Sequence, residues 1–218
     1  MDWILKHSMM TLARVLMIFC VSASLWGCTS NNKGQTRDVR VTASGPKKQK
    51  LPTIEVFTMG KVDDGLRDAL LDSLRTIYKD CRFVKNVPLP QSAYYRPRNR
   101  YLAVKLNSFL SKWHTKNNIV VGLTQVDISL MNFRNRPNSG IFGSSNYIGG
   151  GVCVFSSYRK SLKEGLFCVM KHELAHAFGL RHCTVSNCVM HDAGGTDLRG
   201  TQFCKNCKVY LKSKGWKL

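Results

Sequence analysis

The chain has 218 residues and nine cysteines, and its 33 basic and 13 acidic side chains give a formal net charge of +20. From residue 51 onward there are 25 basic and 11 acidic residues, a net charge of +14, so the folded part is basic as well. Residues 51–218 suffice for one compact domain with a core. No internal repeat is present, which excludes a repeat protein, and the charge favours anionic partners: nucleic acid, anionic lipid, or acidic polysaccharide or peptide.

Residues 1–28 have the organisation of a signal peptide. Lys6 and Arg14 make the start basic, and the short apolar run VLMIFCVSASLW leads to LWGC, which ends at Cys28. This run is too short to span a bilayer but suits an export signal. Because Gly27 and Cys28 resemble the end of a bacterial lipobox, we expect Cys28 to be acylated and to anchor the exported protein to the cell envelope. An ordinary cleaved signal and an uncleaved anchor are the alternatives.

The folded domain is predicted to begin after a tether. Residues 29–50 are rich in Ser, Thr, Asn, Gly and Lys and have no apolar period, which is typical of a flexible linker. LPTIEVFTMG, residues 51–60, then predicts a strand. Residues 63–80 predict a helix with Asp63 or Asp64 as its N-cap. CRFVKNV, residues 81–87, predicts a second strand.

A second helix is predicted for residues 97–113, because Pro97 suits a first helical turn and apolar residues follow at helical spacing. The segment YYRPRNRYLAVK also mixes aromatic residues with arginines, as nucleic-acid-binding patches do. No nucleic-acid motif accompanies it, so no nucleic acid is expected as a partner. Residues 118–129, NIVVGLTQVDIS, predict a strand buried on both faces. This order of strands and helices predicts a mixed sheet with parallel neighbours.

The polar, Gly-rich residues 132–146 are predicted to form a loop on the rim of a cleft. Residues 147–159, YIGGGVCVFSSYR, then predict a short strand entered through Gly149–Gly151. These glycines either permit close approach of a bound peptide backbone or form a plain turn. Residues 161–180, SLKEGLFCVMKHELAHAFGL, predict a final long helix.

This last predicted helix contains candidate metal ligands and a candidate general base. His172 and His176 are four residues apart, so a helix stacks them on one face and directs both imidazoles to a common point. Glu173 can lean over a metal-bound water as a general base. Gly179 suits the left-handed residue that ends a helix, and the turn would bring back His182 as a third ligand. Three nitrogens leave one tetrahedral position of a zinc ion open to water, which is typical of catalytic zinc.

A set of four cysteines follows: Cys183, Cys188, Cys204 and Cys207. Two short pairs of thiolates form a closed tetrahedral zinc site, and such a metal contributes to folding a C-terminal lobe with few apolar residues. Two disulfides, or one disulfide and two free thiols, are the alternative, because exported thiols are unusual in oxidising surroundings. Cys81, Cys153 and Cys168 remain as small buried side chains, although Cys153 and Cys168 are candidates for a further pair.

The spacing of these residues resembles a known family. HExxHxxGxxH followed by a methionine is typical of metzincin peptidases, and Met190 in CVMH matches the Met-turn, which floors the zinc site. A cysteine directly after the third histidine, CxM four residues later, and a final CxxC resemble the archaemetzincin family. The similarity covers about Ile54 to Leu211. It implies an α+β, zincin-like metzincin fold in which a mixed twisted sheet packs against helices, with one zinc on the three histidines and a structural zinc on the four cysteines.

Residues 51–218 are therefore predicted to be a metzincin-type metallopeptidase domain that acts as a monomer on peptides or proteins, acidic ones included. Zinc would lower the pKa of its bound water and polarise the scissile carbonyl, while Glu173 passes the water's proton to the departing amine. Tyr147 and His191 are equal candidates for stabilising the oxyanion. A zinc-built binding domain without catalysis is the first alternative, opposed by the intact Glu173. A zinc-ribbon nucleic-acid protein is the second, opposed by the export signal.

Overall fold

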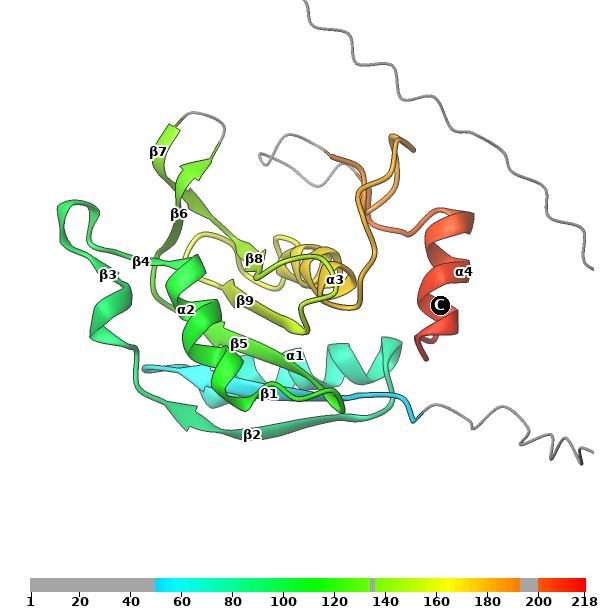
Figure 1. The fold of residues 1–218 in the computed structure, drawn as a ribbon, viewed down its shortest axis with the longest axis horizontal. Coiled ribbons are helices and arrows are strands. Elements are labelled where there is room, and N and C mark those ends of the chain that lie inside the picture. Colours follow the sequence, from blue (N-terminus) through cyan, green and yellow to red (C-terminus); the bar gives the residue numbers. More distant parts are fainter. Residues whose placement is uncertain (1–49, 134–135, 193–199) are drawn as a thin grey trace, which may run out of the picture. The chain divides into compact units, whose positions relative to one another are not determined.

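The apolar runs of the sequence pair into a mixed sheet. The computed structural model describes residues 50–133, 136–192 and 200–218, and within them this sheet has the strand order β2-β1-β5-β9-β8 (Figure 1). The bounds are Thr53–Met59 (β1), Cys81–Val87 (β2), Asn118–Thr124 (β5), Gly143–Ser145 (β8) and Val152–Ser156 (β9). β2, β1, β5 and β9 run parallel, and β8 pairs antiparallel with β9 at one edge. The predicted mixed sheet with parallel neighbours is confirmed.

A second, smaller sheet has the order β3-β4-β6-β7 in the same described ranges. Its bounds are Tyr94–Tyr95 (β3), Arg100–Leu102 (β4), Ile128–Phe133 (β6) and Arg136–Ile141 (β7). β4 pairs parallel with β6, and the other pairs are antiparallel. This sheet was not predicted from the sequence.

Helices cover both faces of the larger sheet. The α-helices are Asp64–Ile77 (α1), Ala103–Leu110 (α2), Leu166–Ala177 (α3) and Lys205–Ser213 (α4), and short 3-10 turns span Gln91–Ala93, Arg96–Arg98 and Ser111–Trp113. The Asp63 side chain accepts a hydrogen bond from the Leu66 N–H over 2.9 Å, so Asp63 is the N-cap of α1.

The hydrophobic core consists of two clusters, because successive side chains of the strands point to opposite faces of the larger sheet. In β5, Val121 and Leu123 pack in the cluster that includes buried residues of α1, α3 and α4, whereas Val120 packs in the cluster that includes α2. Successive side chains of a strand point to opposite faces, so a strand that is apolar throughout serves both clusters. A Cβ on Gly122 would lie 2.5 Å from the Leu110 side chain, so the glycine permits the close approach of α2.

Three predicted segments were wrong in their extent. The helix predicted for residues 97–113 begins only at Ala103, because Asn99 is left-handed with a φ of 47° and Arg100–Leu102 pair as β4. The strand predicted for residues 118–129 is two strands, β5 and β6, which belong to different sheets. The loop predicted for residues 132–146 contains β7 and β8, whose polar, Gly-rich composition hides their pairing.

The predicted signal peptide, Cys28 and the tether up to residue 49 lie outside the described residues. Of the helices that the structure describes, none combines the length and the apolar character needed to cross a lipid bilayer.

Candidate active site and metal centres

The three predicted histidines meet at one point. Helix α3 stacks His172 and His176, and the chain leaves the helix through Gly179, which has a φ of 98°. His182 then returns toward the helix. The Nε2 atom of His176 lies 3.1 Å from that of His172 and 3.1 Å from that of His182, and the remaining pair is 3.2 Å apart. We call these residues the histidine triad.

Hydrogen bonds orient two of the imidazoles. Nδ1 of His172 donates to the Val189 carbonyl oxygen over 2.7 Å, and Nδ1 of His176 donates to the Leu180 carbonyl oxygen over 2.7 Å. Burial lowers the pKa of both rings, which favours their neutral forms. A neutral imidazole with its proton on Nδ1 has its lone pair on Nε2. In both rings this lone pair is therefore directed at the point where the triad meets.

This arrangement fits a zinc ion. Lone pairs about 3 Å apart repel one another unless a cation or a proton lies between them. Two nitrogens bound to tetrahedral zinc at the usual bond lengths of about 2.0–2.1 Å lie about 3.3–3.4 Å apart, close to the spacing in the triad. Carbonyl acceptors behind the ligating imidazoles are also usual in zinc sites.

Glu173 lies beside the triad on the same helix. Its Oε2 atom accepts two hydrogen bonds from Ser145 in β8, from the backbone N–H over 2.8 Å and from Oγ over 3.1 Å. Burial raises the pKa of the Glu173 carboxyl, and the electrostatic interaction with His176 and the bonds from Ser145 act in the opposite direction. Ser145 was missed in the sequence because it falls in a segment predicted to be a loop.

Met190 is fully buried and packs in the core cluster that includes α3. Its carbonyl oxygen accepts the Cys183 N–H over 2.9 Å, which closes the turn between the two predicted ligand sets. The Met-turn role of Met190, in which the methionine supports the site without binding the metal, stays a prediction.

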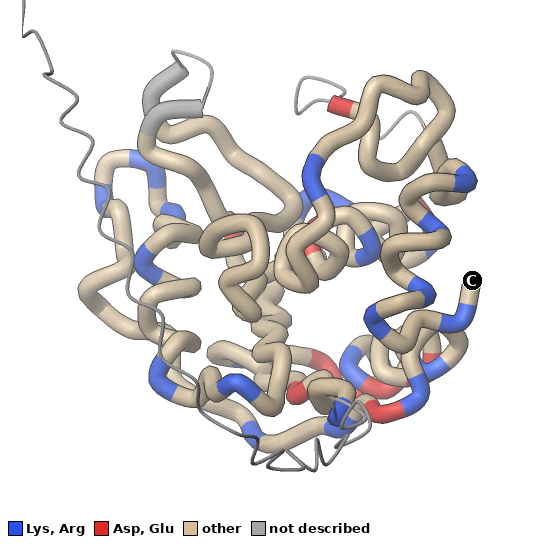
Figure 2. Tube along the Cα trace, turned by 45° about the vertical axis from the view of Figure 1, so that its right-hand side comes forward, with Lys and Arg blue, Asp and Glu red and all other residues tan. Residues whose placement is uncertain are grey.

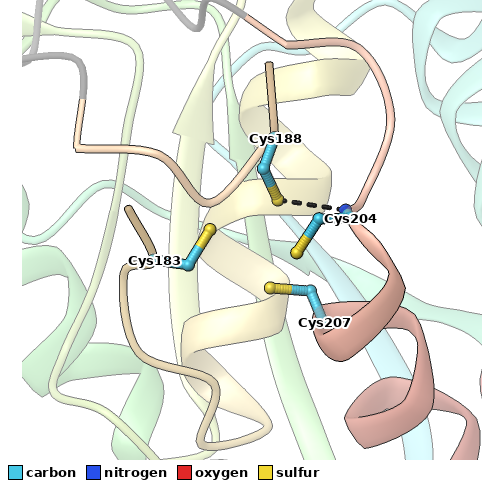
Figure 3. A group of neighbouring side chains, drawn as sticks. All are labelled: Cys183, Cys188, Cys204 and Cys207. Atoms are coloured by element: carbon cyan, nitrogen blue, oxygen red, sulfur yellow. Dashed lines mark hydrogen bonds between the residues drawn. The ribbon is translucent and has the colours of Figure 1, made fainter. Parts of the chain in front are cut away.

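The four predicted cysteines converge as a second group, which we call the cysteine cluster. Figure 3 shows the side chains of Cys183, Cys188, Cys204 and Cys207 pointing toward one another. All four sulfur atoms lie within 4.8 Å of one another. The seven cysteines in the described part of the chain are free thiols, so neither the alternative disulfides of this set nor a Cys153–Cys168 bond is formed.

The surroundings of the cysteine cluster suit thiolates bound to a cation. Cys188 Sγ accepts backbone N–H bonds from Cys204 over 3.2 Å and from Met190 over 3.4 Å. A backbone hydrogen bond from Cys207 lowers the pKa of the Cys204 thiol. Burial raises the pKa of the Cys207 thiol, so a bound cation is needed to hold that sulfur as a thiolate.

The glycines of the segment before β9 are bonded to α3. The N–H of Gly149 donates to the His176 carbonyl oxygen over 2.8 Å, and that of Gly151 donates to Ala177 over 3.2 Å. These donors are used within the fold, which supports the plain-turn interpretation. The sheet edge beside the triad is β8 instead, and α3 packs against both β8 and β9 (Figure 1).

Among the described residues, neither Tyr147 nor His191 makes a hydrogen bond to a histidine of the triad. The Tyr147 side chain is 67% exposed, and the buried Nδ1 of His191 has no hydrogen-bond partner among the described residues. The assignment of an oxyanion-stabilising residue therefore stays a prediction.

Three imidazoles that share one point beside a carboxylate, two of them on a helix packed under a sheet edge, are the arrangement used by zinc metallopeptidases. The fold and the site together define this class for the chain. The family model described as Peptidase family M54 matches residues 53–213, and the chain belongs to this family.

Relatives of known name agree with this membership. An archaemetzincin of Pyrococcus furiosus is 31% identical over 186 residues, which cover 74% of this chain and 93% of that protein. An archaemetzincin of Methanopyrus kandleri is 31% identical over 138 residues, covering 59% of this chain and 75% of that protein. The predicted resemblance to archaemetzincins is confirmed.

Solved structures agree on the fold. The crystal structure of archaemetzincin from Methanopyrus kandleri covers 77% of this chain and 97% of its own, with 26% sequence identity and a TM-score of 0.60. That of archaemetzincin from Archaeoglobus fulgidus, complexed with malonate, covers 72% of this chain and 99% of its own at 21% identity, with a TM-score of 0.56. The predicted α+β metzincin fold is confirmed, and the protein is a zinc metallopeptidase with peptide substrates.

Proposed function

We propose that the chain hydrolyses peptide bonds at the histidine triad with Glu173 as the general base. The observation that carries this proposal is the convergence of three Nε2 atoms, 3.1 to 3.2 Å apart, beside the Glu173 carboxylate. His172, His176 and His182 would hold one zinc ion. When bound, zinc lowers the pKa of a coordinated water toward neutrality and polarises the scissile carbonyl.

Glu173 would take the proton of the attacking water and deliver it to the departing amine. A general base works best when its pKa lies near the working pH. Burial raises the pKa of Glu173 from the usual carboxyl range, which moves it in the required direction. The bonds from Ser145 keep the ionised form accessible, because donors to a carboxylate stabilise its charge.

The cysteine cluster would hold a second, structural zinc ion. Four thiolates leave no position for water, so this ion would take no part in catalysis. The cluster joins the loop after α3 to the first turn of α4, since Cys204 is the N-cap of that helix and Cys207 lies within it. A metal at this point would fix the C-terminal helix to the catalytic loop.

The substrate would bind as an extended peptide along β8, whose far edge is not paired with another strand among the described residues. Acidic peptides would be favoured by the net charge of +14 from residue 51 onward. Lysines and arginines are spread along the chain trace, whereas several acidic residues gather on α1 (Figure 2).

The protein would act as a monomer exported to the cell envelope, with Cys28 as a lipid anchor. Mass spectrometry of the N-terminus of protein purified from membranes tests this part: an acylated Cys28 is expected. A mature N-terminus elsewhere, or an intact Met1, would overturn it without affecting the peptidase proposal.

Zinc content and hydrolysis of an unbiased peptide library, measured on the full chain beside Glu173→Gln, test the catalytic proposal. Two zinc ions in both proteins, with cleavage confined to wild type, are expected. Turnover by Glu173→Gln would refute the general base. Two zinc ions without cleavage by either protein would favour the alternative, a zinc-stabilised binding domain on the cell envelope.

A further inference from the structure

Two hydrogen bonds from one residue of the edge strand reach one oxygen of the catalytic carboxylate. The backbone N–H of Ser145 lies 2.8 Å from Glu173 Oε2, and the Ser145 hydroxyl oxygen lies 3.1 Å from the same atom. No hydrogen bond from the described residues reaches Oε1. Among the described residues, the carboxylate is therefore held by hydrogen bonds through Oε2 alone.

The pairing of β8 explains why Ser145 faces Glu173. Asn146 donates its N–H to Val152 and Ser156 donates to Phe142, so the bonded pair within β8 is Ser144 with Val154. In an antiparallel ladder the intervening residue directs its N–H away from the partner strand. The Ser145 N–H is thus turned outward from β9 and is available to the carboxylate.

The same face of β8 is fitted closely to Glu173. Gly143 lies two residues before Ser145 and so shares its face of the strand. A Cβ on Gly143 would lie 3.0 Å from Glu173 Cγ and 3.1 Å from Val169 Cγ1. The strand therefore lies close to the Glu173 side chain at Gly143 and is hydrogen-bonded to it at Ser145.

β8 is itself anchored from the opposite side of the sheet. Asn107 of α2 is only 1% exposed, and its Nδ2 donates to the Ser144 carbonyl oxygen over 3.0 Å. A buried amide holds a strand strongly, because breaking its bond would leave polar groups without partners. The bond from Asn107 therefore fixes the position of the strand that contains Ser145.

We infer that Ser145 is a positioning residue for peptide hydrolysis: it fixes the Glu173 carboxylate through Oε2, so that Oε1 faces the reacting water and carries the proton. This inference rests on the proposed role of Glu173 as general base. In this assignment the N–H and the hydroxyl of Ser145 bond Glu173 Oε2, and Ser145 acts on the reacting water only through that carboxylate.

The first test compares Ser145→Ala and Ser145→Thr in the full chain. Because the backbone N–H bond survives in both variants, we expect Ser145→Ala to lower kcat by about tenfold with KM and zinc content unchanged. Ser145→Thr keeps Oγ and should retain most of the wild-type kcat. Ser144→Ala is the matched control, since its side chain faces the other side of the strand and its Oγ bonds only the neighbouring backbone. A wild-type kcat in Ser145→Ala, or loss of zinc together with activity, would overturn the inference.

A second test does not use catalysis. In metal-free protein, the effects of Ser145→Ala and Glu173→Ala on the midpoint of urea unfolding should be non-additive, because the two side chains bond each other. Additive effects would show that the bond is absent in solution and would overturn the positioning role. Turnover by Glu173→Gln would overturn the general base and, with it, the role of Ser145. If Glu173→Gln is inactive and Ser145→Ala is fully active, only the positioning role of Ser145 is overturned.

Discussion

The backbone N–H of Cys183 donates to the carbonyl oxygen of Met190 over 2.9 Å, and this bond ties the histidine triad to the cysteine cluster. His182 directly precedes Cys183 in the chain. Val189, directly before Met190, supplies the carbonyl that orients His172. The same loop therefore contains ligands of the cysteine cluster and the carbonyl that orients a histidine of the triad. A structural change in one group should alter the geometry of the other.

Cys207→Ser should weaken zinc binding at both groups, although Cys207 lies on α4 and contacts no histidine of the triad by hydrogen bonds. Loss of the structural ion that we propose for this cluster would release the loop that orients His172 and carries His182. Loss of such supports commonly lowers metal affinity by about 10- to 100-fold. Competition titration with a zinc chelator measures this, with Cys168→Ser as the control. Unchanged affinity of the triad in Cys207→Ser would show that the two groups are independent.

Asp127 joins the two sheets, and its removal should destabilise the fold. The carboxylate is 9% exposed, and it pairs with Arg159 over 2.6 Å and with Arg100 of β4 over 2.6 Å. Asp127→Asn leaves both guanidinium groups without their counter-charge. We expect the free energy of unfolding to fall by about 2–3 kcal/mol, which is less than the cost of about 3–5 kcal/mol for breaking a fully buried pair, because Arg159 is partly exposed.

Urea unfolding of zinc-loaded protein measures this change. Asp72→Asn is the control, because the Asp72–Arg75 pair on α1 is exposed and should contribute less than about 0.5 kcal/mol. Equal effects of the two substitutions would contradict a structural role for the Asp127 pairs.

The triad and the cysteine cluster could be predicted because local geometry determines much of each. Helical periodicity alone places His172 beside His176, and the left-handed turn at Gly179 follows from its lack of a side chain. The apolar strands were predictable for a similar reason: β5 is buried at every position, so its composition alone reveals it.

Contacts between distant segments were not predictable in this way. Ser145 and Glu173 are 28 residues apart, and only the pairing of β8 with β9 brings them together. Tyr101 fitted a helical period, but in the structure it pairs with Tyr94 across β3 and β4, with ring centroids 5.2 Å apart. Short edge strands bury too little apolar surface to leave a pattern in the sequence.

Thiol reactivity should distinguish the cysteines of the native protein. Cys168 is partly exposed and should be alkylated by N-ethylmaleimide first. Cys81 and Cys153 should resist, because both are buried and burial raises the pKa of Cys81 to about 12 and that of Cys153 well above its usual value. The cysteine cluster should react only after a chelator has removed the zinc ion that we propose for it.

Mass spectrometry of peptides from native, chelator-treated and urea-unfolded protein follows these reactions without added reductant. All seven described cysteines should react once the chain is unfolded and free of metal. Cysteines that react only after reduction would identify disulfides and contradict the thiol state of the cluster.

Tyr78 should make the fold sensitive to alkaline pH. Its side chain is 2% exposed, its hydroxyl donates to the Pro52 carbonyl oxygen over 2.6 Å, and burial raises its pKa to about 12. The unfolded chain loses this proton near the usual value of about 10, so the folded state binds more protons between these two values. Stability from this group is therefore fully present below about pH 10 and falls by about 2–3 kcal/mol as the pH rises to about 12.

Urea unfolding at a series of pH values from 8 to about 11.5 tests this dependence. Tyr78→Phe should be less stable than wild type at pH 8 by about 1 kcal/mol, because the Pro52 carbonyl loses its partner. Its stability should nevertheless decline less steeply above about pH 10, since no buried hydroxyl remains to ionise. Tyr158→Phe, at a position that is 63% exposed, is the control and should keep the wild-type slope. Parallel pH profiles for wild type and Tyr78→Phe would show that the Tyr78 hydroxyl ionises as readily in the fold as in the unfolded chain.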